Sequence, residues 1–344
     1  MWQGPNGHNG ARVRGVRVRV ASPSVTEPWR VLALAPLPVD VLQRLFGVEG
    51  AELVVPPERT QQAVEALLPT ADIVIGDWSR GLRVHEPGRR VAFVQVPSVG
   101  VDTVDTDACA RAGVPVANAA GANTTSVAEW CVAATLALLR RTVEADAAVR
   151  RGEWPQTTLG GRELAGSRVG VVGMGPIGRA VATMFTALGC TVDYWSRSRH
   201  DDAPAEYVEL DQLLAGSDVV VLVIALGPTT RHLLDARRLA LMQPSALLVN
   251  GARGDVVDEA ALMDVLREGR LAGAALDVFR TEPMPPGSPL RDLPGVLLSP
   301  HLGGSTDQAA RRLVAQARAN LLRALSGEPV VDVVNGVDPH VSRR

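Results

Sequence analysis

The chain has 344 residues, enough for two domains with separate cores, and its 46% hydrophobic and 21% charged residues are ordinary for a globular protein. The formal net charge of −2 gives no reason to expect nucleic acid or an acidic membrane surface as a partner. All 35 basic residues are arginine, so chemistry that needs a lysine amine is excluded. No apolar run reaches the length of a transmembrane helix.

The cysteines and the N-terminal segment bear on location. Cys109, Cys131 and Cys190 lie in apolar surroundings, which indicates buried free thiols in a reducing compartment and hence a cytoplasmic protein. The first 26 residues carry four arginines, no acid and no continuous apolar core. This composition favours a disordered extension over residues 1–28 rather than a secretory signal.

From Trp29 onward, short apolar runs alternate with segments of helical pattern. Strands are expected at residues 30–35, 51–55, 72–76, 91–96 and 114–118, with helices at 38–47, 58–68 and 103–112. Continuous apolar strands separated by helices predict a parallel sheet that is covered on both faces.

A strong helix pattern follows at Ser126 to Arg141, where Ser126 and Glu129 form a capping box. After a looser stretch the pattern restarts, with strands expected at 168–173, 191–195, 218–225, 246–250, 273–278 and 295–300. Six is the number of strands in the full doubly wound dinucleotide-binding fold. One more helix is expected at about 305–326.

The turn after the first strand of this second series reads VGVVGMGPIGRA and places Gly173, Gly175 and Gly178 in the pattern GxGxxG before a helix at 176–188. The first glycine allows the tight turn, the second lets backbone amides approach a pyrophosphate, and the third lets helix and strand pack closely. The helix N-terminus attracts the anion. The alternative is a glycine turn that serves packing alone.

The whole pattern predicts an α/β protein in which a doubly wound parallel-sheet (Rossmann) cofactor domain is inserted into a smaller flavodoxin-like α/β domain. We infer the insertion because a single helix remains after the second strand series and must pack on the first domain. The expected substrate-binding and catalytic domain comprises residues 29–122 plus 302–337, and the expected dinucleotide-binding domain comprises residues 123–301.

The form of the dinucleotide depends on the loop after the strand at 191–195. An acid that holds the ribose 2′-hydroxyl should follow this strand, about 20 residues after the glycine turn. Asp193 lies inside the strand, whereas the loop itself offers Ser196, Arg197 and Ser198. Hydroxyls and a guanidinium suit a 2′-phosphate, so NADPH is favoured and NADH remains an alternative. A solvated basic loop without a ligand is the other interpretation.

Each of the last three expected strands is followed by a polar residue that suits catalysis: Arg253, Glu282 and His301. The carboxyl ends of parallel strands face the ligand crevice. An anion clamp, a carboxylate and an imidazole form the set needed to reduce an α-keto acid. Taken singly, the arginine and the glutamate are more often solvated surface residues, and the histidine is more often structural or exposed; their joint placement favours the catalytic interpretation.

The chain resembles the D-isomer-specific 2-hydroxyacid dehydrogenases from about Trp29 to Val337. Six segments carry the resemblance, in order and at the spacing of the family: PSVGVDTVD, TTSVAEW, VGVVGMGPIGRA, VNGARGDVVDEAAL, GAALDVFRTEP and LLSPHLGG. The resemblance implies that Arg253 binds the substrate carboxylate, that His301 exchanges a proton with the substrate oxygen, and that Glu282 hydrogen-bonds and orients His301.

The resemblance also implies that backbone amides around Val99 and Gly100 complete the carboxylate site. Further cofactor contacts are expected in the matching segments at Pro176, Ile177, Gly251, Ala252, Asp277 and Gly303. The loop at 76–81 differs from the usual arginine-bearing version, which leaves Arg80 as an uncertain substrate contact. The histidines and cysteines show no metal-binding spacing.

The expected function is therefore reversible, NAD(P)-dependent reduction of a small 2-oxo acid to the D-2-hydroxy acid, by a homodimer. Glyoxylate or hydroxypyruvate is the favoured substrate, and a bulkier 2-oxo acid stays open. The rival hypothesis is a dinucleotide-sensing binding protein that resembles the C-terminal-binding corepressors on the same fold. A peptide-docking cleft and very slow turnover would distinguish that rival.

Overall fold

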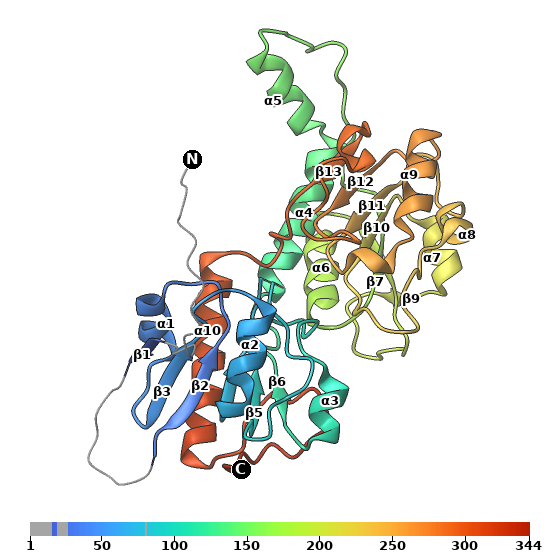
Figure 1. The fold of residues 1–344 in the computed structure, drawn as a ribbon. Helices are drawn as coiled ribbons and strands as arrows, with labels where there is room; N and C mark the ends of the chain where they lie inside the picture. The colour runs from blue at the N-terminus through green and yellow to red at the C-terminus, as the bar shows by residue number, and fades with distance from the viewer. Residues whose placement is uncertain (1–15, 19–26, 80) are drawn as a thin grey trace. The chain divides into compact units, whose positions relative to one another are not determined.

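The structure is a computed structural model that describes residues 16–18, 27–79 and 81–344. These residues form two compact units, which can be followed by residue number in Figure 1. Unit 1 contains the described residues up to Ala122 together with Ala310–Arg344, and unit 2 contains Asn123–Ala309. The second junction falls at Ala309, inside the last helix, rather than at residue 301.

Unit 1 is built on one sheet with strand order β1-β3-β2-β4-β5-β6, in which only the edge strand β1 is antiparallel. The strands are β1 (Val16–Val18), β2 (Trp29–Ala33), β3 (Ala51–Val55), β4 (Ile73–Ile75), β5 (Phe93–Gln95) and β6 (Val116–Ala117). Without β1 the order is 2-1-3-4-5, as in flavodoxin-like folds.

The start of the chain differs in part from the expected disordered extension at residues 1–28. Val16–Val18 pair with β3, which adds a strand to the sheet. The carbonyl groups of Glu27 and Pro28 both accept hydrogen bonds from Arg343, at 2.6 Å. These residues are therefore described as part of unit 1, and the remainder of the segment lies outside the described residues.

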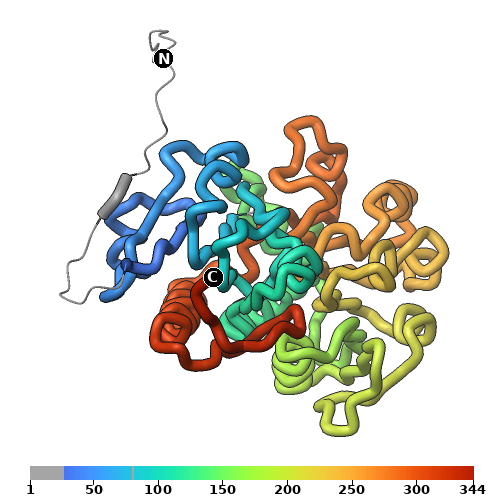
Figure 2. Tube along the Cα trace, turned by 60° about the horizontal axis from the view of Figure 1, so that its bottom comes forward, coloured from blue at the N-terminus to red at the C-terminus, as the bar shows by residue number. Residues whose placement is uncertain are grey.

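Helices cover both faces of the unit 1 sheet. On one face the core includes α1 (Val39–Phe46) and α10 (Asp307–Ser326), and on the other it includes α2 (Gln61–Leu67), η1 (Leu68–Thr70) and α3 (Thr106–Arg111). Figure 2 shows the C-terminal segment, in red, returning beside the blue and cyan part of the chain. The last helix therefore packs on the first domain, as we inferred from the sequence.

Unit 2 has a fully parallel sheet with strand order β13-β12-β11-β10-β7-β8-β9. The strands are β7 (Arg168–Val172), β8 (Thr191–Trp195), β9 (Glu206–Tyr207), β10 (Val219–Leu222), β11 (Leu247–Asn250), β12 (Gly273–Leu276) and β13 (Val296–Leu298). The order is that of the doubly wound dinucleotide fold with one added strand, so the predicted fold class is confirmed. Strand β9 was missed because it is short, lies at the edge and carries no apolar run.

Helices α4 (Thr124–Leu139) and α6 (Pro176–Ala187) pack on one face of this sheet. The other face is covered by α7 (Leu210–Gly216), α8 (Ala236–Leu239) and α9 (Glu259–Arg267), and short turns η2 (Gly254–Val256) and η3 (Pro289–Asp292) follow β11 and β12. Helix α5 (Thr142–Arg150) extends away from the sheet of unit 2 (Figure 1). No helix among the described residues is long and apolar enough to cross a membrane.

The first turn of α4 differs from its prediction. The helix begins at Thr124 with Asn123 as its N-cap residue, so the capping box of Ser126 and Glu129 is wrong. Ser126 is buried inside the helix, and its Oγ shares a hydrogen bond of 2.8 Å with Oγ1 of Thr306. A tertiary partner that is distant in the sequence thus takes the hydroxyl that the local pattern assigned to a cap.

The prediction of buried free thiols is confirmed, since all three cysteines are unpaired and buried. Burial, with smaller contributions from Asp105 and Glu86, raises the pKa of the Cys109 thiol to about 11. Burial also raises the pKa of Cys131 and of Cys190. The neutral thiol is therefore the stable form of each at physiological pH.

The N-cap of α9 offers a test of how the sequence specifies this unit. Asp258 accepts hydrogen bonds from the amides of Ala260 and Ala261, so Asp258→Ala should lower the free energy of unfolding by about 1 kcal/mol. Asp264→Ala on the same helix removes only an exposed pair with Arg267 and should change it by less than about 0.5 kcal/mol. Urea unfolding of both variants checks this, and equal effects would contradict the capping role.

Candidate active site

The glycine turn that follows β7 has the geometry of a binding loop. Gly173 has φ of +108°, and a Cβ there would lie 2.8 Å from the carbonyl oxygen of Val223. A Cβ on Gly178 would lie 2.0 Å from the carbonyl oxygen of Gly173, so helix α6 could not pack this close with any other residue. These two glycines are required by the fold itself.

Gly175 is different, because a Cβ at this position would meet nothing within 4 Å and its φ is −73°. Neither backbone strain nor packing within the described chain therefore requires glycine here. It is the N-cap of α6, with Pro176 and Ile177 in the first turn and no side-chain cap. The open space and the uncapped amides fit an approaching pyrophosphate.

The loop after β8 is held by its own hydrogen bonds. The hydroxyl of Tyr194 donates to the carbonyl of His200 at 3.0 Å and accepts from its amide at 2.8 Å. Ser196 is buried, and its Oγ donates to the carbonyl of Ser198 at 2.6 Å. Arg197 and Ser198 themselves are exposed. The exposed part of the loop thus presents the side chains of Arg197 and Ser198, while the hydroxyl of Ser196 is engaged within the loop.

Asp193, the acid of β8 that precedes the expected ribose-binding loop, forms an ion pair with an arginine. Asp193 is buried in β8, and its Oδ2 accepts from Nε of Arg168 at 2.5 Å. Arg168 is the first residue of β7, so this pair lies toward the amino end of the strands. Asp202, farther along the loop, pairs with Arg179, whose hydrogen bond lowers the pKa of this carboxyl. Asp193 is therefore no candidate for a ribose contact.

Three neighbouring strands bring the catalytic candidates to one edge of the unit 2 sheet. The strands β11, β12 and β13 are adjacent and parallel, and Asn250, Leu276 and Leu298 are paired at their carboxyl ends. Arg253 follows β11, Glu282 follows β12 and His301 follows β13. All three residues therefore follow the carboxyl ends of adjacent parallel strands, as expected from the sequence.

Arg253 is held in a short turn. Asn250 is buried, its Nδ2 donates to the carbonyl of Arg253 at 3.1 Å, and its Oδ1 accepts from the amide of Ala252 at 3.0 Å. A Cβ on Gly254 would lie 2.0 Å from the carbonyl carbon of Phe279, so the turns after β11 and β12 are in direct contact. This contact fixes the start of the Arg253 loop against the turn that leads to Glu282.

His301 and Glu282 are paired. Nδ1 of His301 lies 2.9 Å from Oε2 of Glu282, whose Oε1 accepts from the amide of Phe279 at 3.0 Å. The imidazole is 36% exposed, and Nδ1 is occupied by the carboxylate, which leaves Nε2 as the ring nitrogen for a substrate. A carboxylate behind an imidazole whose other nitrogen faces outward is a proton-transfer arrangement.

Asp277 organises the turn that carries His301. Its Oδ1 accepts from Oγ of Ser299 at 2.5 Å and from the amide of Leu302 at 2.7 Å, and its Oδ2 accepts from the amide of Gly303 at 2.7 Å. A Cβ on Gly303 would lie 2.9 Å from Oδ2 of Asp277. His301 itself has φ of +57°, a left-handed conformation that the surrounding hydrogen bonds maintain.

The remaining predicted residues fall into three groups. Gly251 is close to α4, since a Cβ there would lie 3.2 Å from Sγ of Cys131, and Ala252 is buried beside it. Val99 and Gly100 belong to a loop of unit 1, after β5. Arg80 lies outside the described residues.

Several polar residues that shape the site were missed by the sequence reasoning. Asn250, Ser299 and Tyr194 were not among the expected site residues, but each forms a hydrogen bond that fixes the backbone of a loop with a candidate residue. The available signal was a polar residue at the end of an apolar strand. Among the described residues, no group of three His, Cys, Asp or Glu side chains is arranged to hold a metal ion.

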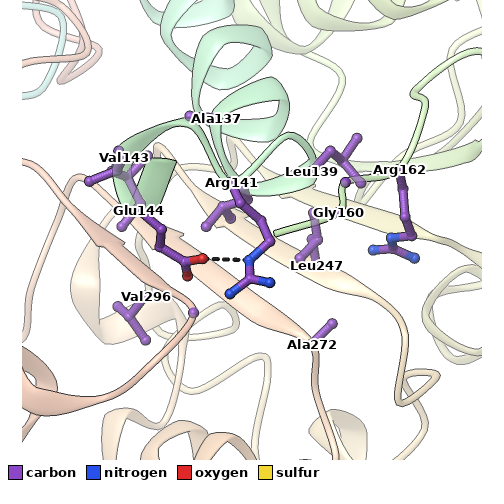
Figure 3. A pocket seen from close by; sticks show the side chains of 14 residues that line it. Ala137, Leu139, Arg141, Val143, Glu144, Gly160, Arg162, Leu247, Ala272 and Val296 are labelled. Atoms are coloured by element: carbon purple, nitrogen blue, oxygen red, sulfur yellow. Dashed lines mark hydrogen bonds and ion pairs between the residues drawn. The ribbon is translucent and has the colours of Figure 1, made fainter. Parts of the chain in front are cut away.

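A pocket of about 320 Å³ lies at the opposite edge of the unit 2 sheet, at the amino ends of β11 to β13. The turn between α4 and α5, the loop at 160–162 and the starts of the strands line it (Figure 3). Arg141 forms an ion pair with Glu144 there. Because the catalytic candidates follow the carboxyl ends of the same strands, this pocket is not the active site.

Known proteins are similar to this chain in both sequence and fold. The family model described as "D-isomer specific 2-hydroxyacid dehydrogenase, NAD binding domain" matches residues 132–303. The chain is 40% identical over 261 residues to a glyoxylate reductase of Thermofilum pendens, covering 73% of this chain and 77% of that protein. It is 38% identical over 285 residues to a D-3-phosphoglycerate dehydrogenase of Mycobacterium leprae, covering 81% and 53%.

A solved glyoxylate reductase from Paecilomyes thermophila superimposes with a TM-score of 0.78 at 27% identity, covering 90% of this chain and 99% of that chain. The relatives are enzymes, so the rival hypothesis of a corepressor-like binding protein is not favoured. The matched residues 132–303 include β7 and β11 to β13 with the loops that follow them. The chain belongs to the D-isomer-specific 2-hydroxyacid dehydrogenases, oxidoreductases with a nicotinamide dinucleotide-binding domain.

Proposed function

We propose that this chain reduces a small 2-oxo acid, glyoxylate or hydroxypyruvate, to the D-2-hydroxy acid with NADPH as the preferred donor. The observation that carries the reaction type is the pair of His301 and Glu282 at 2.9 Å, on the sheet edge that also carries Arg253. The substrate class rests on the likeness to glyoxylate reductases, 40% identical over most of their length.

Each residue of the site has a separate role in this reaction. The planar guanidinium of Arg253 binds the acid group of the substrate through paired hydrogen bonds. His301 gives the proton on Nε2 to the oxygen of the 2-oxo group, and takes it back in the reverse direction. Glu282 holds Nδ1, which fixes the orientation of the ring. When bound, the reduced nicotinamide supplies the hydride that C2 receives.

The turn from Gly173 to Gly178 would hold the pyrophosphate, and Arg197 and Ser198 would hold the 2′-phosphate, while Ser196 fixes the loop through its hydrogen bond to the carbonyl of Ser198. Two observations support NADPH rather than NADH. The only acid of β8 before this loop, Asp193, is buried in a pair with Arg168, and the exposed tip of the loop carries a guanidinium. The guanidinium forms strong charge-assisted hydrogen bonds with an anionic phosphate, whereas its hydrogen bond to a neutral ribose hydroxyl is weaker.

We also propose that the protein is a homodimer that associates through the arm formed by α5 and the following loop. This arm extends from unit 2 (Figure 1) and carries apolar side chains that are largely exposed: Val143 at 57%, Val149 at 51% and Trp154 at 78%. The pocket at the amino ends of β11 to β13 adds concave apolar surface next to it. Exposed apolar surface of this kind is typical of protein interfaces.

A cytoplasmic location fits this proposal. The chain's cysteines are free and buried, with their thiols in the neutral form, as expected for a protein of a reducing compartment.

The substrate and the cofactor can be tested together. Glyoxylate, hydroxypyruvate, a phosphorylated 2-oxo acid and a branched 2-oxo acid should be assayed with NADPH and with NADH. We expect the highest kcat/KM with glyoxylate or hydroxypyruvate and NADPH. Arg197→Gln should reduce the preference for NADPH about tenfold or more, since a charge-assisted contact contributes about 1.5–3 kcal/mol.

Arg270→Gln is the matched control for the cofactor, because Arg270 is paired with Glu268 before the amino end of β12. A strong preference of the native protein for NADH would contradict the cofactor proposal. Turnover of the phosphorylated acid alone would instead indicate a phosphoglycerate dehydrogenase.

The proton-transfer role predicts a large effect of His301→Gln. This variant should lower kcat by about 10²–10⁴ because the general acid is lost, while the dissociation constant for NADPH stays within about twofold. Stopped-flow turnover and fluorescence titration of NADPH measure the two quantities. His340→Gln, at an exposed histidine paired with Asp338, should leave both unchanged. Near-native turnover of His301→Gln would remove this residue from the mechanism.

The proposed interface predicts that Trp154→Ser weakens the dimer. In the proposed dimer the indole of Trp154 is buried, so its removal should raise the dissociation constant of the dimer by about 10² or more. Analytical ultracentrifugation over a concentration series measures it. Leu188→Ser, which removes another exposed apolar side chain of unit 2, should have no effect. A native protein that is monomeric at micromolar concentration would refute the proposal.

A further inference from the structure

A fully buried amide lies in the unit 1 sheet, on the strand next to its β6 edge. Gln95 is the last residue of β5 and is 0% exposed, as are its neighbours Val94 and Val96. A buried amide costs free energy unless both its ends are hydrogen-bonded, and an apolar residue would fill this place at no such cost. The partners of Gln95 therefore indicate what the amide does.

Both ends of the Gln95 amide are satisfied by elements that are distant in the sequence. Its Oε1 accepts from Nδ2 of Asn320 in α10 at 2.8 Å. Its Nε2 donates to the carbonyl of Asn118, after β6, at 3.1 Å, and to its neighbour Val96 at 3.1 Å. Gln95 thus joins the returning helix α10 to the carboxyl end of β6.

Asn320 is itself fixed. It is buried, its Oδ1 accepts from the amide of Val331 at 2.9 Å, and its Nδ2 also donates to the carbonyl of Val331 at 2.9 Å. The C-terminal segment therefore sets the orientation of the Asn320 amide, and through it the orientation of Gln95.

The other end of this chain of amides reaches the loop that follows β5. Nδ2 of Asn118 donates to the carbonyl of Val99 at 2.7 Å. The amide of Ala119 donates to the carbonyl of Ser98 at 2.9 Å, and Oγ of Ser98 donates to the carbonyl of Gly100 at 2.6 Å. The carbonyl groups of this short loop are thereby all engaged by hydrogen bonds, which fixes the direction of its peptide groups.

We propose that Asn118 is the positioning residue of the loop Ser98–Gly100, and that the amide chain Asn320–Gln95–Asn118 orients this loop to receive the substrate carboxylate. The inference rests on the proposed function and on the expectation, implied by the family resemblance, that backbone amides around Val99 and Gly100 bind that carboxylate. Asn118 acts through the loop, so it governs the affinity for the acid and leaves the proton transfer by His301 unaffected.

The chain offers a matched control for a general structural effect. Asn335 bridges the backbone of unit 1 in the same way, since its Nδ2 donates to the carbonyl of Val114 at 2.9 Å and its Oδ1 accepts from the amide of Val116 at 3.1 Å. These contacts lie at the amino end of β6, whereas Asn118 follows its carboxyl end. Asn335→Asp therefore removes the same donor group at the opposite end of the strand.

The first experiment compares the kinetics of Asn118→Asp and Asn335→Asp with glyoxylate and NADPH. Asn118→Asp loses the donor to Val99, and we expect KM for glyoxylate to rise about tenfold while kcat and KM for NADPH stay within about twofold. Asn335→Asp should leave all three values unchanged. Gln95→Met, which cuts the chain one step farther away, should raise KM for glyoxylate about threefold.

A second measurement decides the inference without any turnover. The protection factor of the Ala119 amide, which donates to the carbonyl of Ser98, should fall about tenfold in Asn118→Asp and remain native in Asn335→Asp. Unchanged exchange, or an unchanged KM in an active and folded variant, overturns the positioning role. If the native protein reduces no 2-oxo acid, the proposed function fails, and the exchange result alone then decides whether Asn118 orients the loop.

Discussion

The hydrogen bonds accepted by the carboxylate of Asp277 are the interactions on which the candidate active site depends most. It accepts hydrogen bonds from Ser299, Leu302 and Gly303, the residues around His301. Three acceptor contacts on one buried carboxylate hold a turn in which His301 adopts the left-handed conformation. A non-glycine residue reaches this conformation only where the surroundings impose it, so the imidazole is preorganised by Asp277 and oriented by Glu282.

Close backbone contacts at glycines fix how near the loops and helices of unit 2 lie to one another. Gly178 allows α6 to approach Gly173, and Gly254 allows the turn after β11 to touch Phe279. Gly175 differs from Gly173 and Gly178 of the same turn, because its Cβ would meet no atom of the described residues within 4 Å. The contrast separates glycines that the packing requires from one that leaves room for a ligand, a distinction that a sequence pattern alone does not make.

Buried polar side chains fix backbone and carboxylate groups within each unit. In unit 2, Arg168 pairs with Asp193, so this carboxylate is not available to the proposed ribose contact. In unit 1, Gln95 and Asn320 tie the end of the chain to the loop at Ser98–Gly100. Both are satisfied polar contacts between distant segments, which rigidify a site more than they stabilise a core.

The sequence by itself determined the two strand series, the returning helix and the residues that follow β11, β12 and β13. These follow from local patterns, because apolar periodicity and strand ends are written in neighbouring residues. Only the tertiary structure decided that β9 joins the sheet, that Ser126 pairs with Thr306 instead of capping α4, and that Asp193 is taken by Arg168. Each of these depends on a partner far away in the sequence, and the choice among competing partners is made by packing, which no local pattern records.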